Sequence, residues 1–267
     1  MSLSVTEKSY LYNSLSSSPS VRPDGRLDYQ FRAIEITTDF LTSSNGSSRI
    51  IASDGSECIV SIKSKVIDHT VLQPDDSLVE VTLDISGQRD DSPMVESISS
   101  LLREVYSKTI DKKSLTLTTK YSFKLYIDVL VISTYSNPIS LISMAIFSAL
   151  NSTYLPKLVS SFDDIEVEEL PTFHDYDMIK FDVNPPLIFL VIIVGNNVFI
   201  DPALNESEIA NNSLIITWND NKISPPIRSL ALNDTYCEGF KPQLLQRSME
   251  LVEKCANGIT AMLQDDK

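Results

Sequence analysis

The sequence predicts a single α+β domain, and three patterns lead to that fold class. Short segments with alternating apolar residues precede a stretch of helical periodicity in the first part of the chain, and the same order recurs in the second part. A third helical pattern covers residues 242–262. Strands followed by a helix, twice over, favour packed layers of sheet and helix over a doubly wound parallel sheet.

The N-terminal residues predict a short helix and a loop. Ser4 and Glu7 have the spacing of a capping box, which is typical of a helix N-terminus. The serine-rich stretch of residues 14–20 ends this helix. We therefore divide the chain into an N-terminal helix and serine-rich loop, residues 1–20, and a single domain, residues 21–267.

The first half of that domain, about residues 21–120, has the pattern of a turn, strands and a helix. Proline and Asp-Gly within residues 22–26 predict a turn, and Asn45-Gly46 and Asp54-Gly55 are typical of hairpins. A helix begins at about Pro93, where apolar residues recur on one face. The predicted strands cover residues 32–36, 48–52, 57–66 and 79–85.

The second half, about residues 121–267, repeats this order. A long β-rich run covers residues 121–133, and a helix follows over residues 138–154. Residues 160–177 have the composition of an acidic loop. Further strands are predicted over residues 181–183, 187–194, 197–200, 214–218 and 222–223.

The charge and the apolar runs argue against two classes of protein, those that bind nucleic acid alone and those that span a membrane with a helix. The 267 residues include 22 Lys and Arg against 36 Asp and Glu, which gives a net charge of −14. Nucleic-acid binding by this chain alone is disfavoured, because phosphate contacts need a basic surface that partners would have to supply. The longest apolar run, residues 187–194, is too short for a membrane-spanning helix, which needs about 20 residues.

Glycine, cysteine and histidine usage narrows the chemistry further. The seven glycines are not clustered, which excludes a Walker loop and a dinucleotide-binding fingerprint. The three cysteines lie far apart and predict reduced thiols in a cytosolic or nuclear chain. His174, Asp175 and Asp177 are ligand types on one segment, but the chain has only 2 histidines. We therefore predict no metal site and no cofactor.

Several motifs, in order along the chain, resemble the RNase PH family. They are the R-P-D-G-R turn of residues 22–26, the hairpin residues 46–47 and 55–60, residues 127–130, and Asp201-Pro202-Ala203 with Glu206 and Glu208. The resemblance covers almost the whole chain. It implies the RNase PH-type fold, in which two βαβα-like halves form one domain with mixed sheets and packed helices.

Within this family, further segments resemble the fungal ring subunits of the RNA exosome. These segments are residues 31–32, 45–58, 87–91, 168–177 and 231–234. The resemblance implies a hexameric ring of RNase PH-like subunits that pair as heterodimers around an RNA channel. It also implies S1/KH-type cap proteins and a separate catalytic exoribonuclease as partners. The implied process is 3′-to-5′ RNA processing and degradation, including rRNA maturation, in the nucleus, nucleolus and cytoplasm.

The residues that the family uses for phosphorolysis are missing at the matching positions. The family places a G-G-T-R-like turn before the second-half helix, where this chain has residues 136–139 and Ile139 in place of the arginine. Its two aspartates six residues apart are also missing, since Asp201 is followed at that spacing by Ser207 and Glu206 by Asn212. We therefore predict no catalytic residues and a structural role in the ring.

Four arginines are the remaining site candidates. Arg103 matches the second of two helix arginines with which the family grips RNA, and its alternative role is a surface ion pair with Glu104 or Glu96. For Arg22, Arg26 and Arg32 the functional interpretation is an interface, in which this arm packs on a neighbouring subunit or a cap protein. The alternative is that Asp24 pairs with a neighbouring arginine and stiffens the turn.

Two other functions stay open at this point. One is an active phosphate-dependent 3′-to-5′ exoribonuclease, and the other is a binding module for a single protein partner outside any ring. Phosphate-dependent release of nucleoside diphosphates would indicate the first, and a stable monomer without ring partners would indicate the second.

Overall fold

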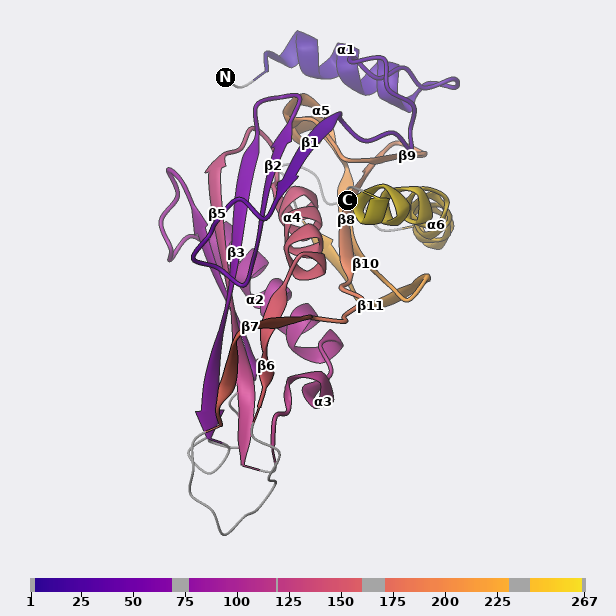
Figure 1. The fold of residues 1–267 in the computed structure, drawn as a ribbon. Helices are drawn as coiled ribbons and strands as arrows, with labels where there is room; N and C mark the ends of the chain where they lie inside the picture. Colours follow the sequence, from indigo (N-terminus) through magenta and orange to yellow (C-terminus); the bar gives the residue numbers. More distant parts are fainter. Residues whose placement is uncertain (1–2, 69–76, 119, 160–170, 231–240, 266–267) are drawn as a thin grey trace.

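The computed structural model describes residues 3–68, 77–118, 120–159, 171–230 and 241–265. Its helices are α1 (Val5–Ser16), α2 (Pro93–Thr109), α3 (Lys112–Leu115), α4 (Ile139–Asn151), α5 (Leu204–Ile209) and α6 (Pro242–Asp265). Its strands are β1 (Ile34–Thr38), β2 (Gly46–Ala52), β3 (Glu57–Asp68), β4 (Val79–Ile85), β5 (Tyr121–Ser133), β6 (Tyr154–Leu158), β7 (Phe173–Lys180), β8 (Leu187–Val194), β9 (Asn197–Ile200), β10 (Asn212–Asn219) and β11 (Lys222–Leu230). The predicted α+β class is confirmed (Figure 1).

Two main sheets lie on either side of α4 (Figure 1). The five-stranded sheet has the order β1-β2-β3-β5-β4, in which only β4 and β5 are parallel. The four-stranded sheet, β11-β10-β8-β9, is antiparallel, and β6 and β7 form a two-stranded sheet. The five-stranded sheet contains strands from both predicted halves, since β1 to β4 precede residue 120 and β5 begins at Tyr121. The division of the domain at residue 120 stays a prediction.

Helix α4 forms the centre of the core. Its residues from Ile139 to Leu150 are all buried, because the helix packs on β2 and β3 on one side and on β8 on the other. A helix that is enclosed in this way has no polar face to present to solvent. The apolar sequence of the helix therefore follows from its central position.

Two serines of α4 also complete the hydrogen bonding of β8. The Ile188 N–H donates to Ser143 Oγ at 2.7 Å, and the Leu190 N–H donates to Ser140 Oγ at 2.9 Å. Strand β9 pairs only with residues 191–194 of β8, so it does not reach these two donors. The serines thus satisfy backbone groups that would otherwise be buried without a partner.

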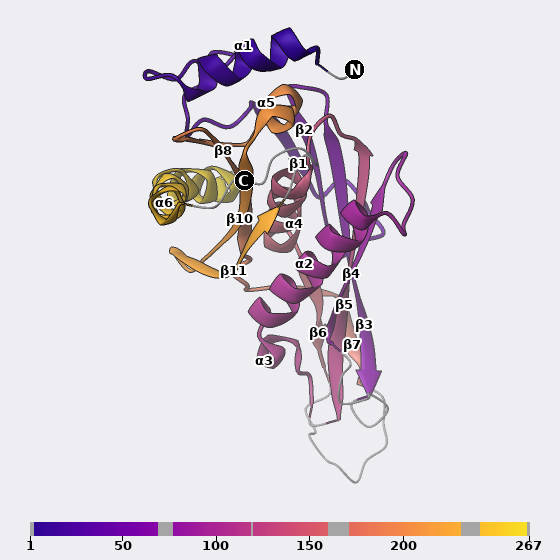
Figure 2. The same cartoon turned by 180° about the vertical axis from the view of Figure 1, so that it is seen from behind.

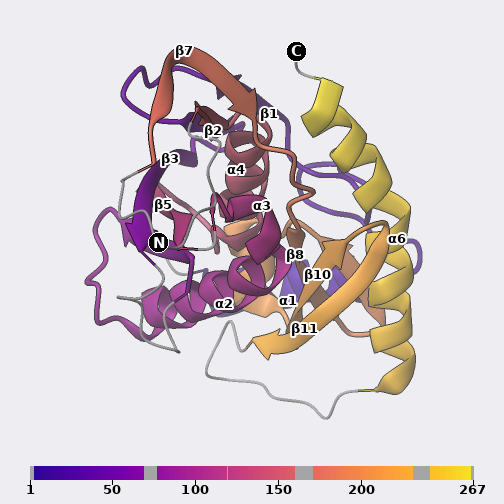
Figure 3. The same cartoon turned by 60° about the horizontal axis from the view of Figure 1, so that its bottom comes forward.

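The other long helices pack against the sheets, and Tyr106 of α2 also reaches Ser143 of α4. Helix α2 packs beside β4, and α6 packs on β8, β9 and β10 (Figures 2 and 3). Helix α1 lies against α5 and β8 and buries Leu15 completely. Its capping box at Ser4 and Glu7 is confirmed. Within the described ranges, no helix is long and apolar enough to span a membrane.

Two predicted boundaries are wrong because the backbone finds other partners. Strand β1 begins at Ile34, not at Arg32, since the Arg32 N–H donates to the carboxylate of Asp201 at 2.8 Å. Asn45-Gly46 is not a turn, because Gly46 is the first residue of β2 and the Asn45 N–H donates to a carbonyl of β3.

The strand predicted over residues 181–183 is absent. Strand β7 ends at Lys180, and the Phe181 N–H donates to the Thr153 carbonyl at 2.9 Å. The acidic loop predicted over residues 160–177 is wrong in part, since its last residues belong to β7. Residues 160–170 of that prediction lie outside the described residues.

Gly46 marks the closest approach between β2 and the end of α4. A Cβ atom at this position would lie 2.3 Å from Thr153 Oγ1 and 2.7 Å from the Ala149 carbonyl oxygen. Both distances are far inside van der Waals contact, and the carbonyl belongs to a packed helix. The position therefore requires glycine.

We expect Gly46→Ala to lower the free energy of unfolding by about 2 kcal/mol, the typical cost of overpacking a core. Urea denaturation measures this change. Gly258→Ala is the matched control, because a Cβ there would meet open space and alanine favours a helix by up to about 1 kcal/mol. Equal losses of stability in both variants would contradict the argument.

Candidate functional site

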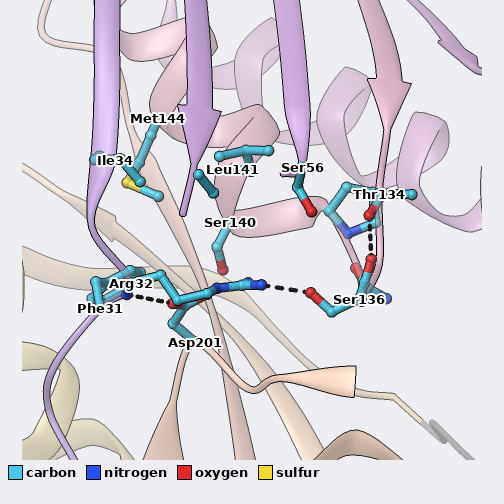
Figure 4. Close-up of a pocket in the computed structure, with 13 residues that line it drawn as sticks. Phe31, Arg32, Ile34, Ser56, Thr134, Ser136, Ser140, Leu141, Met144 and Asp201 are labelled. Carbon is cyan, nitrogen blue, oxygen red and sulfur yellow. Dashed lines mark hydrogen bonds and ion pairs between the residues drawn. The ribbon is translucent and has the colours of Figure 1, made fainter. Parts of the chain in front are cut away.

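The position that matches the family's phosphate turn lies at the N-terminus of α4 and is nearly filled. The cavity there has a volume of about 10 Å³, which is close to the space that one water molecule needs. Its walls come from the segment before β1, the β2–β3 turn, the segment after β5, α4 and the residue after β9 (Figure 4). A phosphate ion is much larger than this cavity.

The N-terminus of α4 is itself poorly suited to an anion. Pro138 occupies the N-cap and has no N–H to offer. The Ile139 N–H donates to Asn137 Oδ1 at 3.2 Å, and the Ile139 side chain is fully buried. Of the first two positions, one therefore lacks a backbone donor and the other already uses its donor within the turn.

Arg32 crosses the mouth of this cavity with its guanidinium group. Its Nε and Nη2 atoms donate to the two carboxylate oxygens of Asp201 at 3.0 and 2.7 Å. Nη1 donates to the carboxylate of Asp54. Nη2 also donates to Ser136 Oγ at 3.2 Å (Figure 4). Each nitrogen of the guanidinium group is therefore engaged within the chain.

Arg22 forms a second ion pair deeper in the same region. Its Nε and Nη2 atoms donate to the two carboxylate oxygens of Glu206 at 2.8 and 2.7 Å. The Arg22 side chain is 0% exposed and that of Glu206 is 1% exposed. Nη1 also donates to the Ile200 carbonyl at 3.2 Å. Such a two-pronged geometry is the strongest form of the arginine–carboxylate pair.

Arg26 joins these two pairs to the turn. Its Nε donates to Asp24 at 2.6 Å, and its Nη1 donates to Asp201 at 2.9 Å. The pairing of Asp24 with a neighbouring arginine, which was one of the two sequence interpretations, is thus present. We call Arg22, Arg26 and Arg32, with Asp24, Asp54, Asp201 and Glu206, the arginine–carboxylate cluster.

Asp201 is the centre of this cluster. Its Oδ2 atom accepts from Arg26, from the Arg32 backbone and from the Arg32 side chain, while Oδ1 accepts from Arg32 alone. Its φ angle is +48°, a left-handed conformation that aspartate adopts more readily than most residues. Four hydrogen bonds thus converge on this carboxylate, three of them on Oδ2.

The cluster shifts the ionisation of two of its members. Burial disfavours the charged form of Arg32, but its bonds and charge interactions with Asp201 and Asp54 outweigh this and raise its pKa. Burial likewise raises the pKa of Asp24, but the hydrogen bonds and charge of Arg26 outweigh it and leave this pKa lowered. Both groups are therefore held in their charged forms.

Arg103 lies on the exposed face of α2, away from the cluster. Its Nε donates to the Val81 carbonyl of β4 at 3.0 Å. Glu104, one of its two expected partners, pairs instead with Lys108 at 2.8 Å and with Arg228. RNA contact by Arg103 stays a prediction, and so does contact of Arg22, Arg26 and Arg32 with a neighbouring subunit.

The remaining candidates are not brought together with the cluster. His174 Nδ1 accepts from the Asp177 N–H at 3.2 Å within β7. Among the described residues, no three His, Cys, Asp or Glu side chains are grouped so as to hold a metal ion. Burial raises the pKa of Cys58 and that of Cys255 to about 12, so neither thiol is a nucleophile at neutral pH.

Sequence reasoning found the arginines of the cluster but not all of their partners. It singled out Asp201 and Glu206 as family motifs, although they lie more than 160 residues from the arginines that they bind. It missed Asp54, which was identified only as part of a turn. The one local signal for Asp54 in the sequence is its place in a predicted hairpin turn that follows the arginine-rich residues 22–32.

Comparison with known proteins identifies the family. The chain is 64% identical to the Exosome complex component RRP42 of Saccharomyces cerevisiae over 267 residues, which cover 99% of this chain and 100% of that protein. The chain belongs to the RNase PH family. Residues 30–156 match the family model for RNase PH, which is described as domain 1 of the 3′ exoribonuclease family.

Other RNase PH-family relatives agree with this assignment. Identity to the Exosome complex component rrp42 of Schizosaccharomyces pombe is 26%, with 98% of this chain and 94% of that protein covered. A solved archaeal exosome core superposes with a TM-score of 0.73 at 17% identity over 97% of both chains, and rice Rrp46 with 0.66 at 13% over 91% and 99%. At these identities the structures show the fold. The predicted RNase PH-type fold and the resemblance to fungal exosome ring subunits are confirmed.

We expect Glu206→Gln to lower the free energy of unfolding by about 3–5 kcal/mol, because it leaves Arg22 buried without its counter-charge. Chemical denaturation measures the loss. The control is Glu208→Gln, which removes a pair with Lys8 near the surface and should cost at most about 1 kcal/mol. Similar values for the two variants would show that burial of the pair does not matter.

The lowered pKa of Asp24 predicts a specific dependence on acid. Its pair with Arg26 stabilises the fold above the ordinary aspartate pKa of about 4 and loses this effect as the pH falls through the lower folded value. Asp24→Asn should therefore lose less thermal stability than the wild type between about pH 5 and pH 2. Thermal unfolding across this range measures the difference. Asp84→Asn, at an exposed position on β4, should keep the wild-type slope.

Proposed function

We propose that this chain is a non-catalytic structural subunit of an RNA exosome ring. The observation that carries the proposal is the 64% identity to a yeast exosome component over the whole length of both chains. The process that this subunit supports is 3′-to-5′ RNA processing and degradation, including rRNA maturation. It lines the RNA channel and holds partner subunits together.

The non-catalytic part of the proposal rests on the site at the N-terminus of α4. Ile139 offers no cation for phosphate, and the adjoining cavity holds about one water molecule. Asp201 and Glu206 are both engaged by arginines. Phosphorolysis needs a bound phosphate and a carboxylate that is free for acid or metal work, and these residues supply neither.

The partners in this proposal are other RNase PH-like ring subunits, S1/KH-type cap proteins and a separate catalytic exoribonuclease. A net charge of −14 favours a subunit that handles RNA only together with more basic partners. Arg103 is exposed and is the residue through which we propose RNA contact. Arg22 is buried, so we propose that it supports an interface only by fixing the segment that carries Arg26 and Arg32.

The proposed locations are the nucleus, nucleolus and cytoplasm, where an exosome component would work. We also propose that residues 1–20 act as an accessory segment of a single domain, residues 21–267. The contacts of α1 with α5 and β8 support a fixed position for this segment on the domain.

The test is to tag the endogenous protein, purify it gently and determine the native mass and composition of the particle. We expect a complex of several different chains, among them RNase PH-like chains of about 29.8 kDa. The purified full-length chain should release no nucleoside diphosphates from RNA when phosphate is added. A lone chain or a simple homo-oligomer would overturn the ring proposal, and phosphate-dependent release would establish the alternative enzyme.

A further inference from the structure

We infer that a polar cavity at the C-terminal end of α4 binds a neutral, polyhydroxylated small molecule such as a sugar or a nucleoside. The cavity has a volume of about 750 Å³, within the usual range of small-molecule sites. Its walls come from the ends of β1, α4, β7 and α6, the start of β6 and the turn between β10 and β11. It lies at the opposite end of α4 from the arginine–carboxylate cluster, and the inference does not rest on the proposed function.

Two residues of α4 line this cavity with buried polar atoms that have no hydrogen-bond partner. Ser148 is 3% exposed, and neither its Oγ atom nor the Asn151 Nδ2 atom has a partner among the described residues. The two residues are three positions apart and therefore share one face of the helix. Leu141 and Met144 continue this face and line the small cavity at the other end of α4. The face that carries the two unsatisfied groups is therefore directed toward the cavities.

A third unsatisfied group lies beside them. Asn219, whose Oδ1 atom is buried without a partner, lines a smaller cavity of about 10 Å³. The two cavities adjoin, because Asn184, Asn221 and Thr260 line both. In the described part of the chain, only Nη2 of Arg26 is a further buried side-chain nitrogen or oxygen without a partner. Since buried polar groups are nearly always hydrogen-bonded, exceptions gathered in one place indicate that a polar molecule belongs there.

The charges around the cavity favour a neutral molecule. Among the described residues that line it, Asp39 and Asp182 are acidic and only Lys180 is basic. The C-terminal end of α4 adds a partial negative charge. An anion such as a phosphate ester is therefore repelled. A cation would meet the carboxylates but has no acceptor for the N–H groups of Asn151.

Hydroxyl groups satisfy these atoms, because each hydroxyl both donates and accepts. A ligand hydroxyl accepts from Asn151 Nδ2, and others donate to Asn219 Oδ1 or to the carboxylates of the wall. Tyr154 also lines the cavity and is 40% exposed. Its aromatic ring packs on the apolar face of a sugar or on a base. The site therefore combines polar groups for hydroxyls with one apolar surface for a ring.

The test adds D-ribose, uridine or uridine 5′-monophosphate to the purified full-length chain. Calorimetry and thermal unfolding measure binding, with trimethylamine N-oxide at equal concentration as the control for general stabilisation by excluded osmolytes. We expect D-ribose or uridine to raise the Tm by about 3–5 °C at roughly ten times its Kd. Equal affinities assign the site to a sugar, and tighter binding of uridine assigns it to a nucleoside. Uridine 5′-monophosphate should bind more weakly than uridine, because its phosphate meets Asp39 and Asp182.

Two variants connect this binding to the unsatisfied groups. Ser148→Ala and Asn151→Ala should each raise the Kd about fivefold, the effect of one lost hydrogen bond. Ser148→Ala should not lower the Tm of the unliganded chain, because it removes a buried hydroxyl that has no partner. A purely structural serine would show the opposite result. Ser100→Ala, at an exposed position on α2, is the matched control and should keep the wild-type Kd.

Three results would overturn the inference. Absence of saturable binding of both D-ribose and uridine would mean that the cavity holds water alone. An unchanged Kd in both Ser148→Ala and Asn151→Ala would place the binding elsewhere. Tighter binding of uridine 5′-monophosphate than of uridine would contradict the charge argument. These readouts do not involve the particle, so a failure of the chain to assemble into a ring would be seen separately.

Discussion

The bonds of Asp201 are the constraint on which the rest of the structure depends. A buried arginine without a counter-charge costs several kcal/mol, so the segment that carries Arg22, Arg26 and Arg32 is stable only where carboxylates meet it. Asp201, the residue after β9, and Glu206, on α5, supply these carboxylates. The N-terminal segment is thereby fixed to a part of the chain that lies about 170 residues away. The start of β1, and with it the edge of the five-stranded sheet, follows from this attachment.

The arginine–carboxylate cluster and helix α4 both line the small cavity at the N-terminus of α4. This cavity links the core to the candidate site. Helix α4 is enclosed by two sheets, and its serines complete the hydrogen bonds of β8. Residues at its N-terminus line the small cavity that Arg32 and Asp201 also line. Pro138 and Ile139 lie at this end, and the Ile139 side chain is fully buried. The apolar core therefore continues along α4 up to the edge of the arginine–carboxylate cluster.

The elements with strong periodicity could be predicted from the sequence, and those fixed by distant partners could not. The alternation over β5 and the apolar face of α2 predicted both elements closely, because burial alone determines them. The start of β1 was wrong because one backbone N–H bonds to Asp201, which no local pattern reveals. The site shows the same division: the replacement of the family's arginine by Ile139 is a prediction from the sequence alone, whereas the pairing of Arg32 with Asp54 depends on the folded hairpin.

The structural and catalytic uses of these carboxylates are mutually exclusive for a physical reason. A general acid or base must exchange a proton with a substrate, which requires a free lone pair and a pKa near the working pH. Asp201 instead accepts hydrogen bonds from Arg26 and from the backbone and side chain of Arg32. The bonds that hold the N-terminal segment therefore use acceptor sites on Asp201 that an acid or base at this position would need. Within the cluster, Asp201 serves to hold the fold together.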